Sequence, residues 1–253
     1  MPSWNIHTAH VERLLAEHDP EALGIVDANA FLFGNYIPDI YVGHMVPDAA
    51  MRIDYRTTHV TPAYMVPIPD ADKFWDDYML RFLPKTDAGL ALLLGTWSHL
   101  TTDRVYNSRV RIYCAEHRLI ANEDLRVRKQ GDFSLFGRSL PISAYVQATS
   151  ELIEAAQAFP PYRILEEDVR RAIEVADGIV QSNNVESAQE GEYRMLSVEW
   201  MTDVFDACNE RLAVWLETWA RLGGRDSSVR AADIRVEAGL PPATSDDPHW
   251  MDY

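Results

Sequence analysis

This sequence lacks the long apolar segment that a membrane-spanning helix needs. Its most apolar run, residues 90–97, is far shorter than the about 20 residues that cross a bilayer. The N-terminal residues have neither the basic group nor the apolar stretch of a signal peptide. We therefore expect a soluble, cytoplasmic protein that does not insert into a membrane.

Cysteine and basic residues are also scarce. Two cysteines, Cys114 and Cys208, are too few for a disulfide framework, and their apolar helical surroundings predict buried free thiols. Lysine and arginine number 23 against 39 aspartates and glutamates, so the net charge is −16. A chain this acidic is unsuited to general nucleic-acid binding or to docking on an anionic membrane by charge.

Strand-like alternation is rare in the sequence, whereas helical spacing of apolar residues recurs along it. We therefore predict a mainly α fold: a single-domain helical bundle over residues 1–224, followed by an acidic, proline-containing C-terminal tail at 225–253. The tail is either disordered or lies on the surface, with Trp250 as a candidate anchor.

Capping residues and apolar spacing place the individual helices. We expect helices that begin at Trp4, Asp27, Asp70, Thr86 and Pro141, and two more over about residues 165–181 and 196–222. Residues 39–69 contain several prolines and are predicted to form a long ordered connection, which is often functional inside a compact domain. Residues 116–138 are a polar stretch.

The histidines carry the first chemical signal. In His99-Leu100-Thr101-Thr102-Asp103 the first and last side chains lie one helical turn apart and can point at one metal ion. Such a pair alone is weak evidence, because many exposed helices carry one as an ion pair. This helix is otherwise strongly apolar, however, and unpaired polar groups there are costly. Gly95, one turn earlier on the same face, leaves room for a close neighbour.

Three further segments contain residues that could join this pair. His7 shares a helical face with apolar residues, Asp39 follows directly on Pro38, and His59 follows Thr58 in the irregular segment. Each also has an ordinary interpretation: a core histidine, a helix stop with a turn, and a loop histidine. His10 and His18 are predicted to lie at the surface.

Taken in order, His7, Pro38-Asp39, Thr58-His59 and His99-x-x-x-Asp103 resemble the bacterial zinc-dependent phospholipase C family, which is related to the zinc-dependent single-strand nucleases. Met-Pro-Ser-x-x-x-His and Phe-Leu-Phe-Gly-Asn-x-x-Pro-Asp resemble a non-secreted branch of that family. The resemblance covers about the first 110 residues.

The resemblance implies a helical bundle that holds a zinc cluster and hydrolyses a phosphodiester or phosphomonoester. Asp39, His59, His99 and Asp103 would hold one zinc ion; His7 and Asp103 would contribute to a second, with Asp103 bridging. Asp39 would act as a ligand only or also as the general base. Ligands of these types suit zinc.

The departures from the family pattern narrow this expectation. Secreted members use an N-terminal tryptophan as a ligand, whereas Trp4 is internal in this sequence. Arg109 occupies the position where those members have a histidine. A later His-x-x-x-Glu pair is absent, because Ala121 occupies the position of its glutamate. We therefore expect one or two zinc ions, without the family's third site. Arg109 and Arg111 could hold a substrate phosphate, and a small soluble phosphoester fits better than a bilayer lipid. The alternative is a non-catalytic helical binding or scaffold protein with a structural or vestigial metal site.

Overall fold

Helices make up the regular structure of this protein. The computed structural model describes residues 2–62, 66–82, 84, 86–185 and 191–242, and these residues form helices and no β-strand. The prediction of a mainly α fold is therefore confirmed. Over the same residues, no helix combines the length and the hydropathy that crossing a bilayer requires.

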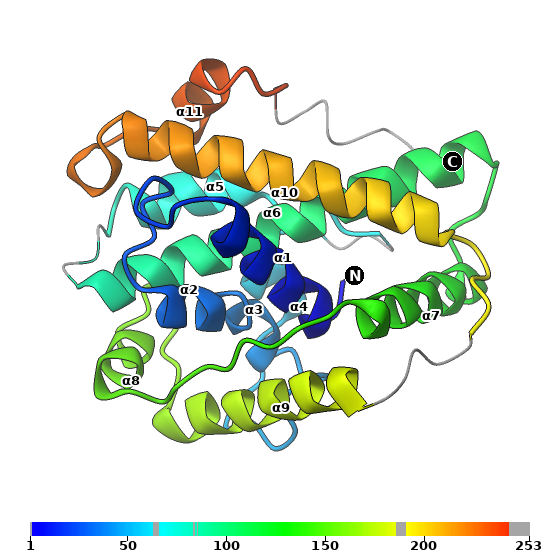
Figure 1. Cartoon of the computed structure of the whole chain (residues 1–253), viewed down its shortest axis with the longest axis horizontal. Helices are drawn as coiled ribbons and strands as arrows, with labels where there is room; N and C mark the ends of the chain where they lie inside the picture. The colour runs from blue at the N-terminus through cyan, green and yellow to red at the C-terminus, as the bar shows by residue number, and fades with distance from the viewer. Residues whose placement is uncertain (1, 63–65, 83, 85, 186–190, 243–253) are drawn as a thin grey trace.

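The central element is α6 (Asp87–Glu116), which runs through the length of the molecule beside α10 (Val198–Arg221) (Figure 1). Its first turn is capped by Thr86, whose hydroxyl accepts from the amide of Gly89 at 3.1 Å. Neighbouring helices cover α6 on several sides, so polar residues such as His99 and Asp103 are buried together with its leucines.

Two glycines bring α6 into backbone contact with α2 (Ala28–Gly34). A Cβ atom on Gly95 would lie 2.1 Å from the carbonyl oxygen of Phe31, and one on Gly34 would lie 2.6 Å from that of Leu92. The room predicted beside Gly95 is thus filled by the α2 backbone. The short helix α3 (Ile37–Ile40) follows almost directly, and Pro38 lies in its first turn instead of only stopping α2.

Tryptophans join α6 to its neighbours. The helix predicted to follow Asp70 is split into α5 (Ala71–Phe74) and a π-helical turn, Trp75–Met79. The ring of Trp75 lies 5.5 Å from that of Trp97, 5.6 Å from that of Trp215 and 5.5 Å from that of Trp219, measured between ring centroids. These edge-to-face contacts make the tryptophans of α10 part of the core.

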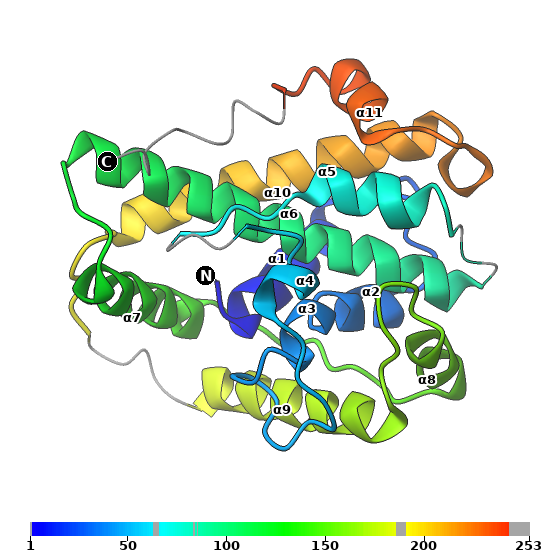
Figure 2. The ribbon, with the colours of Figure 1, turned by 180° about the vertical axis from the view of Figure 1, so that it is seen from behind.

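The remaining helices surround this centre (Figure 2). They are α1 (Trp4–Glu17), α4 (Tyr55–Thr58), α7 (Glu123–Ser139), α8 (Ser150–Gln157), α9 (Glu166–Val185), the 3₁₀ turn Gly224–Asp226 and α11 (Ala231–Glu237). Helix α10 ends as predicted at the glycine pair, where Gly223 takes a left-handed φ of 109°. Cys114 and Cys208 are buried and free, as predicted.

In the second half of the chain, one helix was not predicted and one predicted helix start is wrong. Residues 123–139 of the polar stretch form α7, capped by Asn122, because Leu125, Phe133 and Phe136 still give it a buried side. Pro141 does not begin a helix: residues 140–149 are irregular, and α8 starts at Ser150 after its cap, Thr149.

The segment after Gly224 is predicted to be a tail that is either disordered or lies on the surface. It contains α11, which packs against α10 and buries Ala231 and Ile234. Trp250, the candidate anchor, lies outside the described residues.

Replacing Gly95 by alanine tests the backbone contact between α2 and α6. The new methyl group would meet a carbonyl oxygen at 2.1 Å, which no side-chain rotation can relieve, so we expect a loss of about 3 kcal/mol or more in the free energy of unfolding. Gly178→Ala in α9 is the control: no atom lies within 4 Å of its Cβ position, and better helix propensity should add about 0.5–1 kcal/mol. Urea denaturation measures both; equal effects of the two substitutions would contradict the contact.

Candidate metal centre

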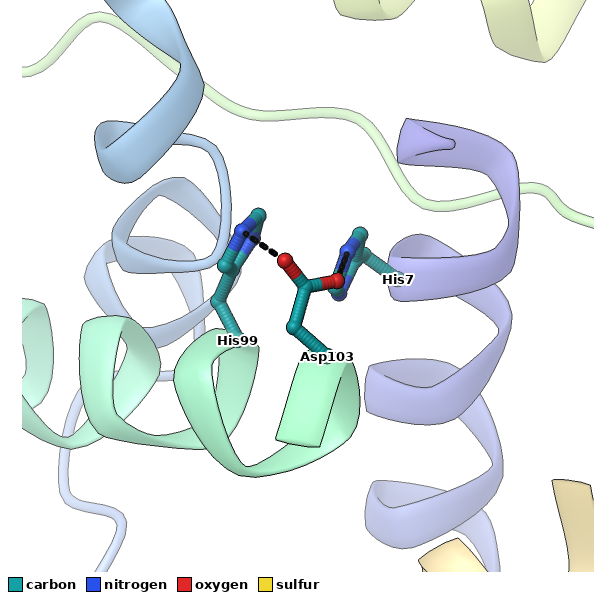
Figure 3. Close-up of side chains that lie close together, drawn as sticks. All are labelled: His7, His99 and Asp103. Carbon is teal, nitrogen blue, oxygen red and sulfur yellow. Dashed lines mark ion pairs between the residues drawn. The ribbon is translucent and has the colours of Figure 1, made fainter. Parts of the chain in front are cut away.

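Five polar side chains from four helical segments meet in the interior. His7 comes from α1, Asp39 from α3, His59 from the residue after α4, and His99 and Asp103 from α6. The three histidines and Asp103 are fully buried, and Asp39 is 6% exposed. Figure 3 shows Asp103 between His99, on its own helix, and His7, on α1. The structure therefore brings all five predicted ligands into one cluster.

The distances within the cluster are those of ligands around a shared ion. Asp103 Oδ1 lies 3.6 Å from His7 Nε2, and Asp103 Oδ2 lies 3.6 Å from His59 Nε2 and 3.7 Å from His99 Nε2. Asp39 Oδ1 lies 3.5 Å from His59 Nε2. These contacts are too long for good hydrogen bonds. Two atoms each about 2.0–2.1 Å from one zinc-sized ion in tetrahedral geometry lie about 3.4 Å apart.

Two overlapping sets of three residues could each hold a metal ion: His7 with His99 and Asp103, and Asp39 with His59 and His99. Asp103 directs one oxygen to His7 and the other to His59 and His99, an arrangement that suits a bridging carboxylate. The assignment of each ligand to a particular ion stays a prediction.

Several atoms of the cluster have no hydrogen-bond partner. Both ring nitrogens of His7 and both carboxylate oxygens of Asp103 are buried and unpaired. Among the described residues, no lysine or arginine forms an ion pair with Asp39 or Asp103. Two buried carboxylates with which no described arginine or lysine forms an ion pair are costly, so the residues present fit a bound cation.

The hydrogen bonds at the far sides of two rings direct their Nε2 atoms inward. His99 Nδ1 lies 2.8 Å from the carbonyl oxygen of Asn35 and must donate to it. The hydroxyl oxygen of Thr58 lies 3.3 Å from the carbonyl oxygen of Tyr55 and 2.8 Å from His59 Nδ1. The Nε2 atoms of the two rings face each other at 3.1 Å, and that of His99 carries a lone pair because its Nδ1 holds the proton. Such partners behind a histidine are typical of metal sites.

The protonation states also suit metal binding. Burial, with a contribution from His7, lowers the pKa of His99 to about 3. Burial opposes ionisation of Asp39 and Asp103, but the neighbouring histidines outweigh it and hold the pKa of each carboxyl below its usual value. At neutral pH the cluster therefore offers the neutral imidazole of His99 and two ionised carboxylates, the forms of these groups that bind metals.

Two aromatic residues at the cluster were not predicted. The indole Nε1 of Trp4 donates to Asp39 Oδ2 at 3.0 Å. The ring of Tyr55 stacks on His59 with ring centroids 3.8 Å apart, and burial with the charges of Asp103 and Asp39 raises the pKa of its hydroxyl. The Tyr55-x-x-x-His59 spacing is a signal that could have suggested the stacking, whereas the sequence contains no sign of the contact between Trp4 and Asp39.

The two arginines considered for substrate phosphate lie in different settings. Arg109 is on an exposed part of α6. Arg111 is buried, and its Nε and Nη2 atoms donate to the carbonyl oxygen of Val66 at 2.9 and 2.7 Å. This bond anchors the connection before α5 to α6, and the role of both residues toward phosphate stays a prediction.

The prediction that His10 lies at the surface is wrong. Its side chain is fully buried, stacks on Phe205 with centroids 4.1 Å apart, and places Nε2 3.2 Å from the hydroxyl of Tyr106. His10 lies outside the apolar face of α1, but α10 covers this side of α1 as well and buries it. Burial lowers the pKa of His10 to about 3.

Comparisons of the chain with protein-family models, with curated proteins and with solved structures found no significant match. A functional assignment therefore rests on the geometry of the five buried side chains and on the motifs in the sequence.

The buried, neutral His10 predicts a loss of stability in acid. Below pH 6.5, the ordinary pKa of histidine, His10 binds a proton in the unfolded chain. In the folded chain it stays neutral down to about pH 3. The free energy of unfolding therefore decreases as the pH is lowered. In metal-free protein, His10→Phe should reduce the loss between pH 7 and pH 5 by about 2 kcal/mol. Urea denaturation at both pH values measures this; the exposed His44→Phe is the control, and equal losses in both variants would refute it.

The cluster also predicts metal in the purified protein. Without added metal or a metal-binding tag, elemental mass spectrometry should find about one or two equivalents of a divalent transition metal, because two ligand sets are present. The double variant His59→Ala/His99→Ala should lose it. The control is His44→Ala/His117→Ala, in which both histidines are exposed. Metal retained by the first double variant would rule out this centre.

Proposed function

We propose that this protein is a zinc-dependent phosphoric ester hydrolase of the phospholipase C type, acting on a small soluble phosphoester. One observation carries the proposal: five buried side chains, three histidines and two aspartates, lie at ligand-to-ligand distances in two overlapping sets. The order of these residues in the sequence, which resembles that family, supports it.

The ligand set favours zinc over other divalent ions. Imidazole nitrogens outnumber carboxylates, which disfavours calcium and magnesium, whose sites are built from oxygen. His99, His59, Asp39 and Asp103 would hold one ion, and His7 and Asp103 a second. Bound zinc supplies a Lewis acid that polarises a phosphoryl oxygen and lowers the pKa of water.

The chain's own residues would then orient the substrate and move the proton. Asp39 is the only one of the five with exposed surface, so it lies nearest to an incoming water or phosphate. Its Oδ2 is occupied by Trp4, which leaves Oδ1 to bind the ion or to accept a proton as general base. The hydroxyl of Tyr55, kept protonated by its raised pKa, lies beside these carboxylates.

A second candidate is a helical binding or scaffold protein with a structural metal site. The burial of the cluster favours it, since His7, His59, His99 and Asp103 have no exposed surface and structural zinc sites are closed shells. This candidate predicts the same metal content and a strong dependence of melting temperature on metal, but no turnover of any phosphoester.

Activity of ligand variants separates the two candidates. On a panel of phosphomonoesters and phosphodiesters, the zinc-loaded protein should hydrolyse at least one, and His99→Ala and Asp39→Asn should each lower kcat/KM about a hundredfold or more. The exposed His44→Ala should retain full activity, and circular dichroism should show that all variants are folded. Hydrolysis retained in both ligand variants would exclude this cluster as the active site, and a zinc-loaded wild type without turnover on the whole panel favours the structural metal site.

A further inference from the structure

Trp4 is held rigidly beside the metal cluster. It is fully buried, and its ring stacks on Tyr36 with centroids 4.6 Å apart. The hydroxyl of Thr8 donates to the Trp4 carbonyl at 2.8 Å and accepts from the hydroxyl of Tyr36 at 2.7 Å. Backbone and ring are thus held by one small network, which favours the orientation of the indole that faces Asp39.

Because the indole binds only one oxygen of Asp39, the two oxygens of this carboxylate have different partners. Oδ2 accepts from Trp4 Nε1 at 3.0 Å, while Oδ1 faces His59 Nε2 at 3.5 Å. A carboxylate with one oxygen bound to an N–H group presents the other one to a metal. The two oxygens of Asp103 also have different partners, because Oδ1 faces His7 and Oδ2 faces His59.

We propose that Trp4 is a positioning residue that keeps Asp39 a one-oxygen ligand and thereby sets the metal preference of the centre. The inference rests on the metal site of the proposed function. A centre with one oxygen from each carboxylate and nitrogens for the rest suits a small four-coordinate ion such as Zn²⁺. Ions that prefer more oxygen ligands, Mn²⁺ among them, gain if Asp39 is free to turn and bind through both oxygens.

Other tryptophans of the core provide a matched comparison. The Nε1 atoms of Trp97 and Trp215 are buried without a hydrogen-bond partner. Burial of an indole in this protein therefore does not require such a bond. Replacing Trp97 or Trp215 by phenylalanine removes the same atoms as Trp4→Phe but no hydrogen bond, which separates the role of the N–H group from that of ring size.

The test measures metal affinity and needs no substrate. Metal-free wild type, Trp4→Phe, Trp97→Phe and Trp215→Phe compete for Zn²⁺ and for Mn²⁺ with a chromophoric chelator, and circular dichroism confirms folding. Trp4→Phe should weaken Zn²⁺ binding about 10–100-fold, the usual effect of losing a partner behind a ligand. The ratio of Zn²⁺ to Mn²⁺ affinity should fall about tenfold or more, while both control variants keep the wild-type ratio.

A second pair of variants shows whether Trp4 acts through Asp39. In the Asp39→Ala background, Trp4→Phe should have no further effect on Zn²⁺ affinity, because the carboxylate that it positions is gone. An equal effect in both backgrounds would mean that Trp4 acts by packing and would overturn the inference, as would a Trp4→Phe variant that matches Trp97→Phe. A wild type that binds no Zn²⁺ would instead overturn the proposed function itself.

Discussion

The contact between α2 and α6 is the constraint on which the rest of the site depends. Gly34 and Gly95 let the two backbones touch, since a Cβ atom on either would collide with a carbonyl oxygen of the other helix. This approach brings the carbonyl of Asn35, the residue after Gly34, to His99 Nδ1, one turn after Gly95. It also starts α3 beside α6, so that Asp39 reaches the same cluster. A larger side chain at either glycine would separate the helices and with them the two halves of the ligand set.

The cluster assembled in this way is poorly explained as ordinary packing. Its two carboxylates are buried and have no arginine or lysine partner among the described residues. The Nε2 atoms of His59 and His99 also meet there at 3.1 Å. Interiors rarely contain such an arrangement unless a cation is present, because unpaired buried charge costs several kcal/mol (about 3–5 when one partner of a pair is removed). The catalytic and the structural interpretations share this requirement. They differ at Asp39 and Tyr55, where the cluster comes nearest to solvent.

Local signals in the sequence predicted much of this arrangement. The spacing of His99 and Asp103, the cap residues Asp27 and Thr86 and the glycines after α10 act within a few residues, so their effect can be inferred without the fold. Helix α7 was missed because its composition is polar and only its buried side is apolar. The burial of His10 and the bond from Trp4 to Asp39 depend on helices far away in the sequence, and no local spacing contains that information.

His7 and His10 show why the unpaired atoms, more than burial, point to function. Both residues lie on α1, three positions apart, and both are fully buried. His10 stacks on Phe205 and contacts the hydroxyl of Tyr106, so its surroundings are those of a core histidine. His7 stacks on His99, leaves both nitrogens without a partner and places Nε2 3.6 Å from an equally unpaired carboxylate oxygen of Asp103. Hydrophobic packing accounts for the first histidine, whereas the surroundings of the second are those of a residue that could hold a metal ion together with Asp103.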